Sequence, residues 1–224
     1  MSLRIFDGAE KPSKGKFADD LVGRFRAGYV TPNGKPASVT AWRITTGDPD
    51  VAQTLAELYG GEPQEWTPGS AKAEDIIEVF TETASIEVIL DGHSAIRSEM
   101  VLFGPAGPIR KCDGVEQKGT EPGDPDTGAA CACPGALDDR KKAAEKGKGC
   151  KPSVTIYFRL ADAPDLGKFR FQSSSWILAA DIAKAEAALD RIDGPARATL
   201  TLVQVETSQR KFTKTVVEVL GAVK

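Results

Sequence analysis

Apolar and polar residues alternate along much of the chain, which is the pattern of strands with one buried face. The alternation is clearest at residues 41–46 (AWRITT) and 153–160 (SVTIYFRL), where β-branched and aromatic residues are frequent. Similar runs lie at residues 76–83, 85–90, 99–103, 109–111, 168–172, 197–205 and 212–220. A turn signal at residues 31–34 (TPNG) separates two further short runs. Because most runs follow one another across short turns, the pattern predicts a mainly antiparallel sheet.

Two segments instead repeat apolar residues at helical spacing. The first helix is expected at residues 49–59, after the start signal Asp48-Pro49 and before Gly60-Gly61. The second is expected at residues 176–192, and Gly194-Pro195 ends it. Their apolar faces consist of Val51, Leu55 and Leu58 in the first helix and Ile177, Ile182, Ala185 and Leu189 in the second.

Together these elements predict an α+β fold, with a mainly antiparallel sheet or partly closed barrel, two helices and a cysteine-rich, metal-stapled insertion. We expect a mobile N-terminal tail at residues 1–18, the first half of the α+β domain at 19–111, the insertion at 112–152 and the second half at 153–224. The insertion is too long for a bare loop in a compact core. A chain of 224 residues can bury a sizeable core, so it does not need metal or disulfides simply to fold.

The overall charge is slightly negative. The chain has 29 Lys and Arg residues against 32 Asp and Glu residues, which gives a formal net charge of −3. Proteins that capture DNA by phosphate neutralisation normally present a basic surface, so this balance argues against independent DNA binding and leaves only a local basic patch open. Residues 1–6 show no secretory signal, and no run approaches the roughly 18 apolar residues of a membrane span. We therefore expect a cytoplasmic protein with reduced thiols and no membrane contact.

All four cysteines, Cys112, Cys131, Cys133 and Cys150, lie in the insertion. Four thiolates make the closed tetrahedral shell of a structural zinc site, and Cys131 and Cys133 can supply two ligands from one turn. The spacing differs from the paired C-x-x-C motifs of common zinc ribbons. Zinc held by all four cysteines is the leading prediction, while free thiols, disulfides and an iron–sulfur cluster remain open alternatives. His93 lies outside the cluster and is expected at the surface.

Two groups of residues are candidate contact surfaces. Arg24, Phe25 and Arg26 would bind a partner protein if the ring is exposed, because aromatic and Arg side chains anchor interfaces. A core-facing Phe25 is the alternative. The basic end of the insertion is a candidate contact for nucleic acid, although a solvated charged surface is the commoner explanation of such a run. Its basic residues are Arg140, Lys141, Lys142, Lys146 and Lys148.

Signals for catalysis are few. His93 is the single histidine, and it lies outside any Ser–His or Cys–His arrangement. The sequence has no Gly-rich phosphate loop, no HExxH and no GxSxG. A zinc ion with four cysteine ligands has no open position for water, so an enzyme that uses the metal would need a different shell. The sequence therefore predicts a binding protein with structural zinc, no enzyme activity and no small-molecule substrate.

Six segments together resemble a known family. They are residues 21–28 (LVGRFRAG), 42–49 (WRITTGDP), 111–114 (KCDG), 131–134 (CACP), 158–162 (FRLAD) and 167–176 (GKFRFQSSSW). In this order they resemble the recombination directionality factors of temperate actinophages, the group that partners large serine integrases. The similarity extends over about residues 20–220, which is nearly the whole chain.

The resemblance implies an accessory protein that binds a large serine integrase on its attachment-site DNA. Such a factor switches site-specific recombination from integration to excision, by promoting recombination between the hybrid sites. It need not read the DNA sequence itself, so little or no independent DNA binding is expected. A chain of this family would be encoded by a phage or prophage and act in the bacterial cytoplasm. The alternative from another class is a nucleic-acid-binding phage replication or repair accessory protein with a structural zinc site.

Overall fold

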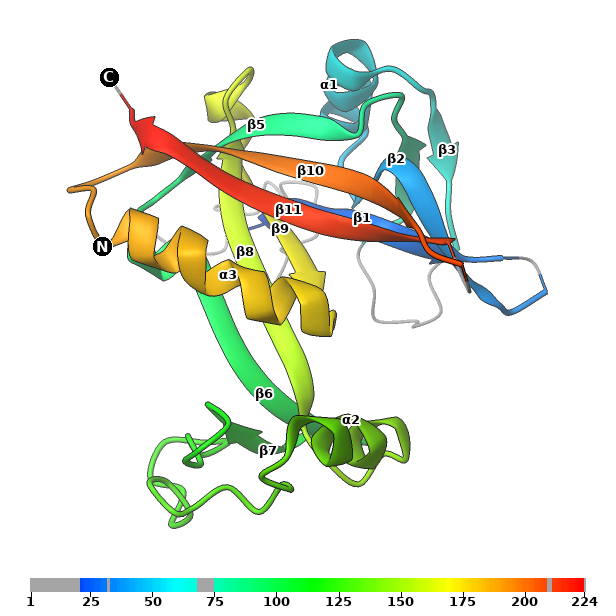
Figure 1. Ribbon diagram of the computed structural model, residues 1–224. Helices are drawn as coiled ribbons and strands as arrows, with labels where there is room; N and C mark the ends of the chain where they lie inside the picture. The colour runs from blue at the N-terminus through cyan, green and yellow to red at the C-terminus, as the bar shows by residue number, and fades with distance from the viewer. Residues whose placement is uncertain (1–20, 32, 68–74, 209–210, 224) are drawn as a thin grey trace, which may run out of the picture.

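The computed structural model describes residues 21–31, 33–67, 75–208 and 211–223 (Figure 1). The predicted tail at residues 1–18 lies outside them. The first part of the chain forms β1 (Leu21–Val30), β2 (Pro36–Thr46), α1 (Pro49–Tyr59), β3 (Pro63–Glu65), β4 (Ile77–Phe80), β5 (Ser85–Leu90), η2 (His93–Ala95), β6 (Ile96–Gly104) and β7 (Gly107–Cys112). The second forms α2 (Leu137–Glu145), β8 (Lys151–Leu160), η3 (Pro164–Leu166), β9 (Lys168–Ser173), α3 (Trp176–Leu189), β10 (Ala196–Glu206) and β11 (Lys211–Ala222).

One eleven-stranded sheet organises the described residues. Its order is β11-β10-β5-β8-β9-β1-β2-β4-β3, and β6 pairs with both β7 and β8. The pair β1–β9 is parallel, and the other strand pairs are antiparallel. The predicted mainly antiparallel sheet is confirmed. The parallel pair joins the first strand of the chain to a strand of its second half, so the two halves share one sheet.

The sheet branches at β8 and stays open, which corrects the prediction of a partly closed barrel. Val88 and Ile89 of β5 pair with the end of β8, at Leu160 and Arg159. The beginning of β8 pairs instead with β6, from Lys151 to Ile156. Because β5 and β6 take successive parts of one edge of β8, the two branches diverge, and β11 and β3 end the main path of the described sheet (Figure 1).

Helix α1 begins and ends as the sequence predicts. The Asp48 side chain accepts hydrogen bonds from the backbone N–H groups of Asp50 and Val51, and Pro49 occupies the first turn. The helix stops at Gly60, whose φ of 76° is a left-handed conformation that favours glycine. Val51 and Leu55 are buried as expected, but Leu58 is 39% exposed and lies at the rim of the packed face.

Helix α3 ends at Leu189, three residues before its predicted end. The Ser175 side chain caps it by accepting from the N–H of Leu178. Ile182, Ala185 and Leu189 are buried as predicted, but Leu178 replaces Ile177 on the buried face, and Ile177 is 37% exposed. The helix packs against β8 and β11, so it covers the face of the sheet that carries the core. None of the described helices is long and apolar enough to cross a membrane.

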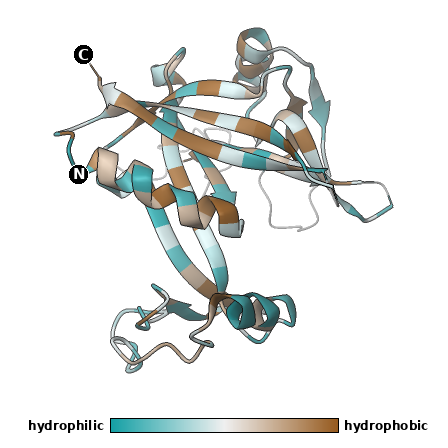
Figure 2. Ribbon diagram, viewed as in Figure 1, coloured by the Kyte–Doolittle hydropathy of each residue, from teal (hydrophilic) through white to brown (hydrophobic). Residues whose placement is uncertain are grey.

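A third helix, α2, lies in the insertion, where the sequence predicted none. None of its residues is buried, so it shows no apolar stripe by which sequence periodicity could identify it. The insertion lies at the far end of β6 and β8, away from α1 (Figure 1). Its ribbon is mostly hydrophilic, whereas brown and teal bands alternate along the long strands (Figure 2). The insertion therefore obtains its order from something other than a core of its own.

Aromatic rings fill the centre of the core. Phe25 contacts Trp42, Phe158 and Phe169 edge-to-face, with ring centroids 5.2–5.6 Å apart. Trp42 also meets Phe171 edge-to-face, at 5.3 Å. All five rings are at most 2% exposed. These rings come from β1, β2, β8 and β9, so the aromatic cluster packs the central strands of the sheet together. Because side chains alternate along a strand, the residues between these rings lie on the opposite, outer face.

Candidate functional site

The sheet brings the two ends of the insertion together. Cys112 is the last residue of β7, and Cys150 directly precedes β8. Both flanking strands pair with β6, where Met100 has Cys112 as its partner on one side and Pro152 on the other. Cys112 and Cys150 are fully buried, and Cys131 and Cys133 are half-buried. Two of the four cysteines are thus placed by the sheet itself.

The four sulfurs form a closed ring of neighbours. The Cys131 thiol donates to Cys112 Sγ at 3.3 Å. The Cys133 backbone N–H donates to Cys131 Sγ at 3.4 Å, and the Cys150 backbone N–H donates to Cys133 Sγ at 3.3 Å. Side-chain hydrogen bonds link Cys131 to Cys133, Cys133 to Cys150 and Cys150 to Cys112. The structure therefore gathers all four predicted ligands, and none of them forms a disulfide.

Backbone turns hold the middle of the insertion against its start. The Cys131 N–H donates to the carbonyl of Val115 at 2.7 Å, and Cys112 forms an isolated bridge with Gln117. The Asp113 carboxylate accepts from the N–H groups of Val115 and Glu116, at 2.9 and 2.8 Å. These hydrogen bonds, and not apolar packing, return the chain so that Cys131 reaches Cys112.

The surroundings of the thiols act differently on their pKa values. Burial raises the pKa of Cys131 to about 11, and burial with neighbouring thiols raises the pKa of Cys150 well above its usual value. Burial also opposes ionisation of Cys133, but hydrogen bonds from Cys150, Cys131 and Arg110 together lower the Cys133 pKa. One sulfur thus lies where donors favour a thiolate, which is the form that binds metals.

The cluster fits a metal only after a small outward movement. As the described residues stand, no three His, Cys, Asp or Glu side chains form a group that could hold a metal ion. Ligands around tetrahedral zinc, with Zn–S bonds of about 2.3 Å, lie about 3.8 Å apart. The Cys112–Cys131 sulfur distance of 3.3 Å is shorter than that, and it is much longer than a disulfide bond of about 2.05 Å. The Cys112 and Cys131 sulfurs therefore lie in contact without a covalent bond.

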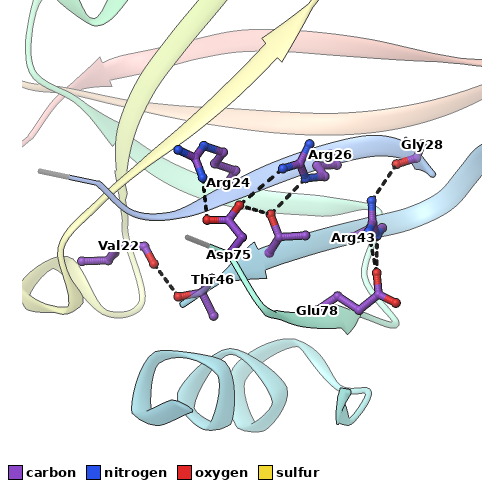
Figure 3. A network of polar contacts seen from close by, with 9 residues as sticks. Val22, Arg24, Arg26, Gly28, Arg43, Thr46, Asp75 and Glu78 are labelled. Carbon is purple, nitrogen blue, oxygen red and sulfur yellow. Dashed lines mark hydrogen bonds and ion pairs between the residues drawn. The ribbon is translucent and has the colours of Figure 1, made fainter. Parts of the chain in front are cut away.

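The Arg24-Phe25-Arg26 segment divides between two faces of β1. Phe25 is 2% exposed in the aromatic core, so its ring packs the sheet and is not a surface anchor. Arg24 and Arg26 project from the opposite face, where both bind the carboxylate of Asp75, at 2.5 and 3.3 Å (Figure 3). The partner-binding prediction thus loses its aromatic residue, while the two arginines stay candidates.

Asp75 and its neighbours form a polar network that the sequence did not reveal. Asp75 is fully buried, and its Oδ2 accepts from the Thr45 hydroxyl at 2.6 Å. The Thr45 hydroxyl in turn accepts from Arg26 Nε at 2.9 Å. Burial lowers the pKa of Arg26, against the opposing effect of Asp75. Since Asp75 already has three partners, it holds the arginines in place and is not a free base.

Arg43 forms a second part of the same network. It lies beside Arg26 in the β1–β2 register and is only 4% exposed. Its Nε donates to Glu78 at 2.6 Å (Figure 3). Its guanidinium also lies 4.7 Å from the centre of the Trp66 ring. Alternation along β2 places Arg43 and Thr45 on the face opposite the core, but no local signal shows that Trp66 and Asp75 contact them there.

The basic residues at the end of the insertion lie on and after α2. Arg140 donates to the carbonyl of Pro134 at 3.0 Å, so it supports the turn that follows Cys133. Lys142 lies 3.6 Å from Asp139, and Lys141 is half-buried. Lys146 and Lys148 are exposed. His93 is also exposed, as predicted, and its Nδ1 lies 2.7 Å from Asp190.

The protein is thus an open α+β sheet that carries a cysteine cluster on an insertion and several arginines on its outer face. The chain belongs to the Gp3-like family, described as recombination directionality factor-like, whose family model matches residues 22–221. The resemblance seen in the sequence is therefore confirmed, and the family is one of accessory recombination factors. No solved structure matches the chain.

Proposed function

We propose that the protein binds a phage large serine integrase on attachment-site DNA and switches recombination from integration to excision between hybrid sites. The observation that carries the proposal is the family match over residues 22–221, which spans both halves of the sheet and the insertion. The partner is a protein, which suits a chain with a net charge of −3.

The switch is a shift between synaptic arrangements of the integrase. A ligand changes such an equilibrium only by its difference in affinity for the two states. Moving an equilibrium from about 1:99 to about 99:1 requires roughly 10⁴-fold tighter binding to the favoured state. The factor must therefore contact a surface of the integrase that differs between the two arrangements.

We also propose that Cys112, Cys131, Cys133 and Cys150 hold a structural zinc ion. The donor set supports this, because four soft thiolates match zinc and would complete its coordination. The polar insertion supports it as well, since α2 buries none of its own residues. When bound, the metal would supply cross-links between the start, middle and end of the insertion. The residues' own part is to bring four sulfurs together on turns held by backbone hydrogen bonds.

The test of the integrase proposal has two stages. Purified full-length protein is first mixed with the large serine integrase encoded on the same genome, with and without attachment-site DNA, and binding is measured by pull-down. Recombination of hybrid sites and of unrecombined sites is then followed on plasmid substrates. The expected result is direct binding, strongest to the integrase–DNA complex, together with gain of hybrid-site recombination and loss of the integrative reaction. Absence of binding in both conditions by folded protein would sink the proposal.

A nucleic-acid-binding phage replication or repair accessory is the second candidate. The exposed Lys142, Lys146 and Lys148 at the end of the insertion favour it. Its mark is DNA binding by the isolated protein that weakens steeply with salt, because phosphate contacts release counterions. Fluorescence anisotropy with a labelled duplex between about 50 and 200 mM salt separates the candidates. Binding that is absent, or independent of those lysines, would leave the integrase proposal in first place.

A further inference from the structure

The outer face of the sheet carries a row of cationic side chains. Arg43 and Arg26 are register partners across β2 and β1, and Arg24 and Arg170 are register partners across β1 and β9. Further along, Arg97 of β6 stacks on the Tyr157 ring of β8, with its guanidinium carbon 5.2 Å from the ring centre. The row therefore crosses five neighbouring strands, in the order β2, β1, β9, β8 and β6.

Three neighbouring hollows follow this row, and each shares lining residues with the next. The first, of about 590 Å³, lies between Trp66 and Gly28. It shares Arg26 and Gly28 with the second, of about 610 Å³, which extends over β9 to Lys151. The second shares Arg170 and Phe103 with the third, of about 240 Å³, which reaches Arg97. We call these three neighbouring hollows, lined by Arg24, Arg26, Arg43, Arg97, Arg170 and Lys151, the arginine groove.

Several of these arginines are fixed before any ligand arrives. Asp75 holds Arg24 and Arg26, and Glu78 holds Arg43. Arg26 and Arg43 also lie over the Trp66 ring, at 5.2 and 4.7 Å. A planar guanidinium that is already oriented loses little further entropy when it binds a carboxylate or phosphate. Arg24, Arg26 and Arg43 therefore form a rigid side of the groove.

Exposed apolar side chains lie in and beside the arginine groove. Val30 is 69% exposed beside the first hollow, and Phe103 is 49% exposed where the second and third hollows meet. Ile109, in the strand that pairs with β6, is 63% exposed. Exposed rings and branched aliphatic side chains beside arginines are typical of protein interfaces. The phosphates of a nucleic acid could contact the arginines, but they would make no favourable contact with the exposed side chains of Val30 and Ile109.

We propose that the arginine groove binds an acidic segment of the partner protein that also carries apolar side chains. The inference rests on the proposed function, which requires a protein partner. Carboxylates of the segment would meet Arg97 and Arg170, and apolar residues would cover Phe103. Strands lie about 4.8 Å apart, so the four steps from β2 to β6 span about 19 Å. A helix of about 13 residues has that length, which sets the size of the expected segment.

The choice of a peptide over nucleic acid follows from the charge already present on this face. Asp75, Glu78 and Glu99 lie among the cations, so the field over the groove is weaker than the row of arginines alone would produce. Duplex DNA is captured through an excess of positive charge that releases counterions. A short acidic peptide instead uses local, directed hydrogen bonds to guanidinium groups.

The test uses overlapping 20-residue peptides that cover the integrase encoded on the same genome. Binding of each labelled peptide to the full-length protein is measured by fluorescence anisotropy. The variant is Arg97→Glu with Arg170→Glu, which leaves in place Arg24, Arg26 and Arg43, the arginines that bind Asp75 and Glu78. The matched control is Lys184→Glu with Arg191→Glu, which reverses two charges on and after α3, on the opposite side of the sheet. Circular dichroism and thermal unfolding confirm that both variants fold.

The expected result is that one or more acidic peptides bind the wild-type chain and the control equally, and bind the groove variant at least tenfold more weakly. The groove variant is also expected to lose pull-down of the whole integrase. Normal integrase binding by the folded groove variant overturns the groove assignment and leaves the proposed function intact. No integrase binding by the wild-type chain overturns both. If no peptide binds and duplex DNA binds the wild-type chain but not the groove variant, the peptide proposal is overturned and the groove is a nucleic-acid surface.

Discussion

Arg24 binds Asp75 across 51 positions of the sequence, with Nη1 and Oδ1 2.5 Å apart. The carboxylate is fully buried, while the side chain of Arg24 is 23% exposed. This contact ties Asp75, two residues before β4, to the outer face of β1. It also explains why Thr45, on the neighbouring strand, is buried although it points away from the core.

Replacing Asp75 with Asn is expected to lower the free energy of unfolding by about 2–3 kcal/mol. Breaking a buried ion pair costs about 3–5 kcal/mol because one charge is left without its partner. The loss here is smaller, since solvent reaches part of Arg24 and Arg26. Urea unfolding measures the change. The control is Asp91→Asn, which breaks an exposed pair with Arg159 and should cost less than about 1 kcal/mol. Equal effects of the two substitutions would contradict the buried network.

Two phenylalanines should behave in opposite ways. Phe25→Ala removes a ring from the aromatic core, and we expect a loss of about 3–5 kcal/mol in unfolding free energy. Phe103 is 49% exposed, so Phe103→Ala should change stability by no more than about 0.5 kcal/mol. If the arginine groove is the interface, Phe103→Ala weakens integrase binding and leaves the melting temperature almost unchanged. A stable Phe25→Ala protein would show that its ring is not part of the core.

The turn after α1 depends on glycine at Gly61. Its φ is 84°, and a Cβ at this position would lie 2.1 Å from the carbonyl oxygen of Phe80. Gly61→Ala should therefore cost about 2–4 kcal/mol, from backbone strain and displacement of β4. Gly34 has a similar φ of 75° but open space around it, so Gly34→Ala should cost only about 1 kcal/mol. Gly34→Ala measures the cost of backbone strain alone, and Gly61→Ala adds the cost of the close contact with Phe80. Thermal unfolding measures both variants, and equal losses of stability would argue against the close contact at Phe80.

Local signals in the sequence predicted much of the sheet and little of its outer surface. Burial alternates along the runs that became β5, β8 and β9, and Asp48-Pro49 begins α1 as its side-chain chemistry requires. The parallel pairing of β1 with β9 joins strands that are far apart in the sequence, so no turn signal between them could predict it. Helix α2 has no buried residue, so its period is invisible. Asp75 lies in no motif, and only the fold shows that Arg24 and Arg26 share it.

The thiol site was predicted from residue type and clustering alone. Position explains why two of the four cysteines lie close together: Cys112 and Cys150 border two strands that share β6 as a neighbour, so the sheet brings them together. The sequence could not show which hydrogen bonds return Cys131 to the cluster, because the donors are backbone groups. The zinc ion itself stays a prediction, and its test follows from the contrast between the polar insertion and the aromatic core.

Purified protein is expected to contain about one zinc per chain by elemental analysis, and Cys150→Ser should contain much less. Removal of zinc by a strong chelator should leave the aromatic core folded, because Phe25, Trp42 and their neighbours lie in the sheet and not in the insertion. Hydrogen exchange should then speed up at residues 113–149, while β8 and β10 stay protected. Cys131→Ser with zinc still bound at full stoichiometry would contradict a four-sulfur shell. Loss of exchange protection throughout the sheet would show that the metal supports the whole fold, against the expectation that a core of this size folds without it.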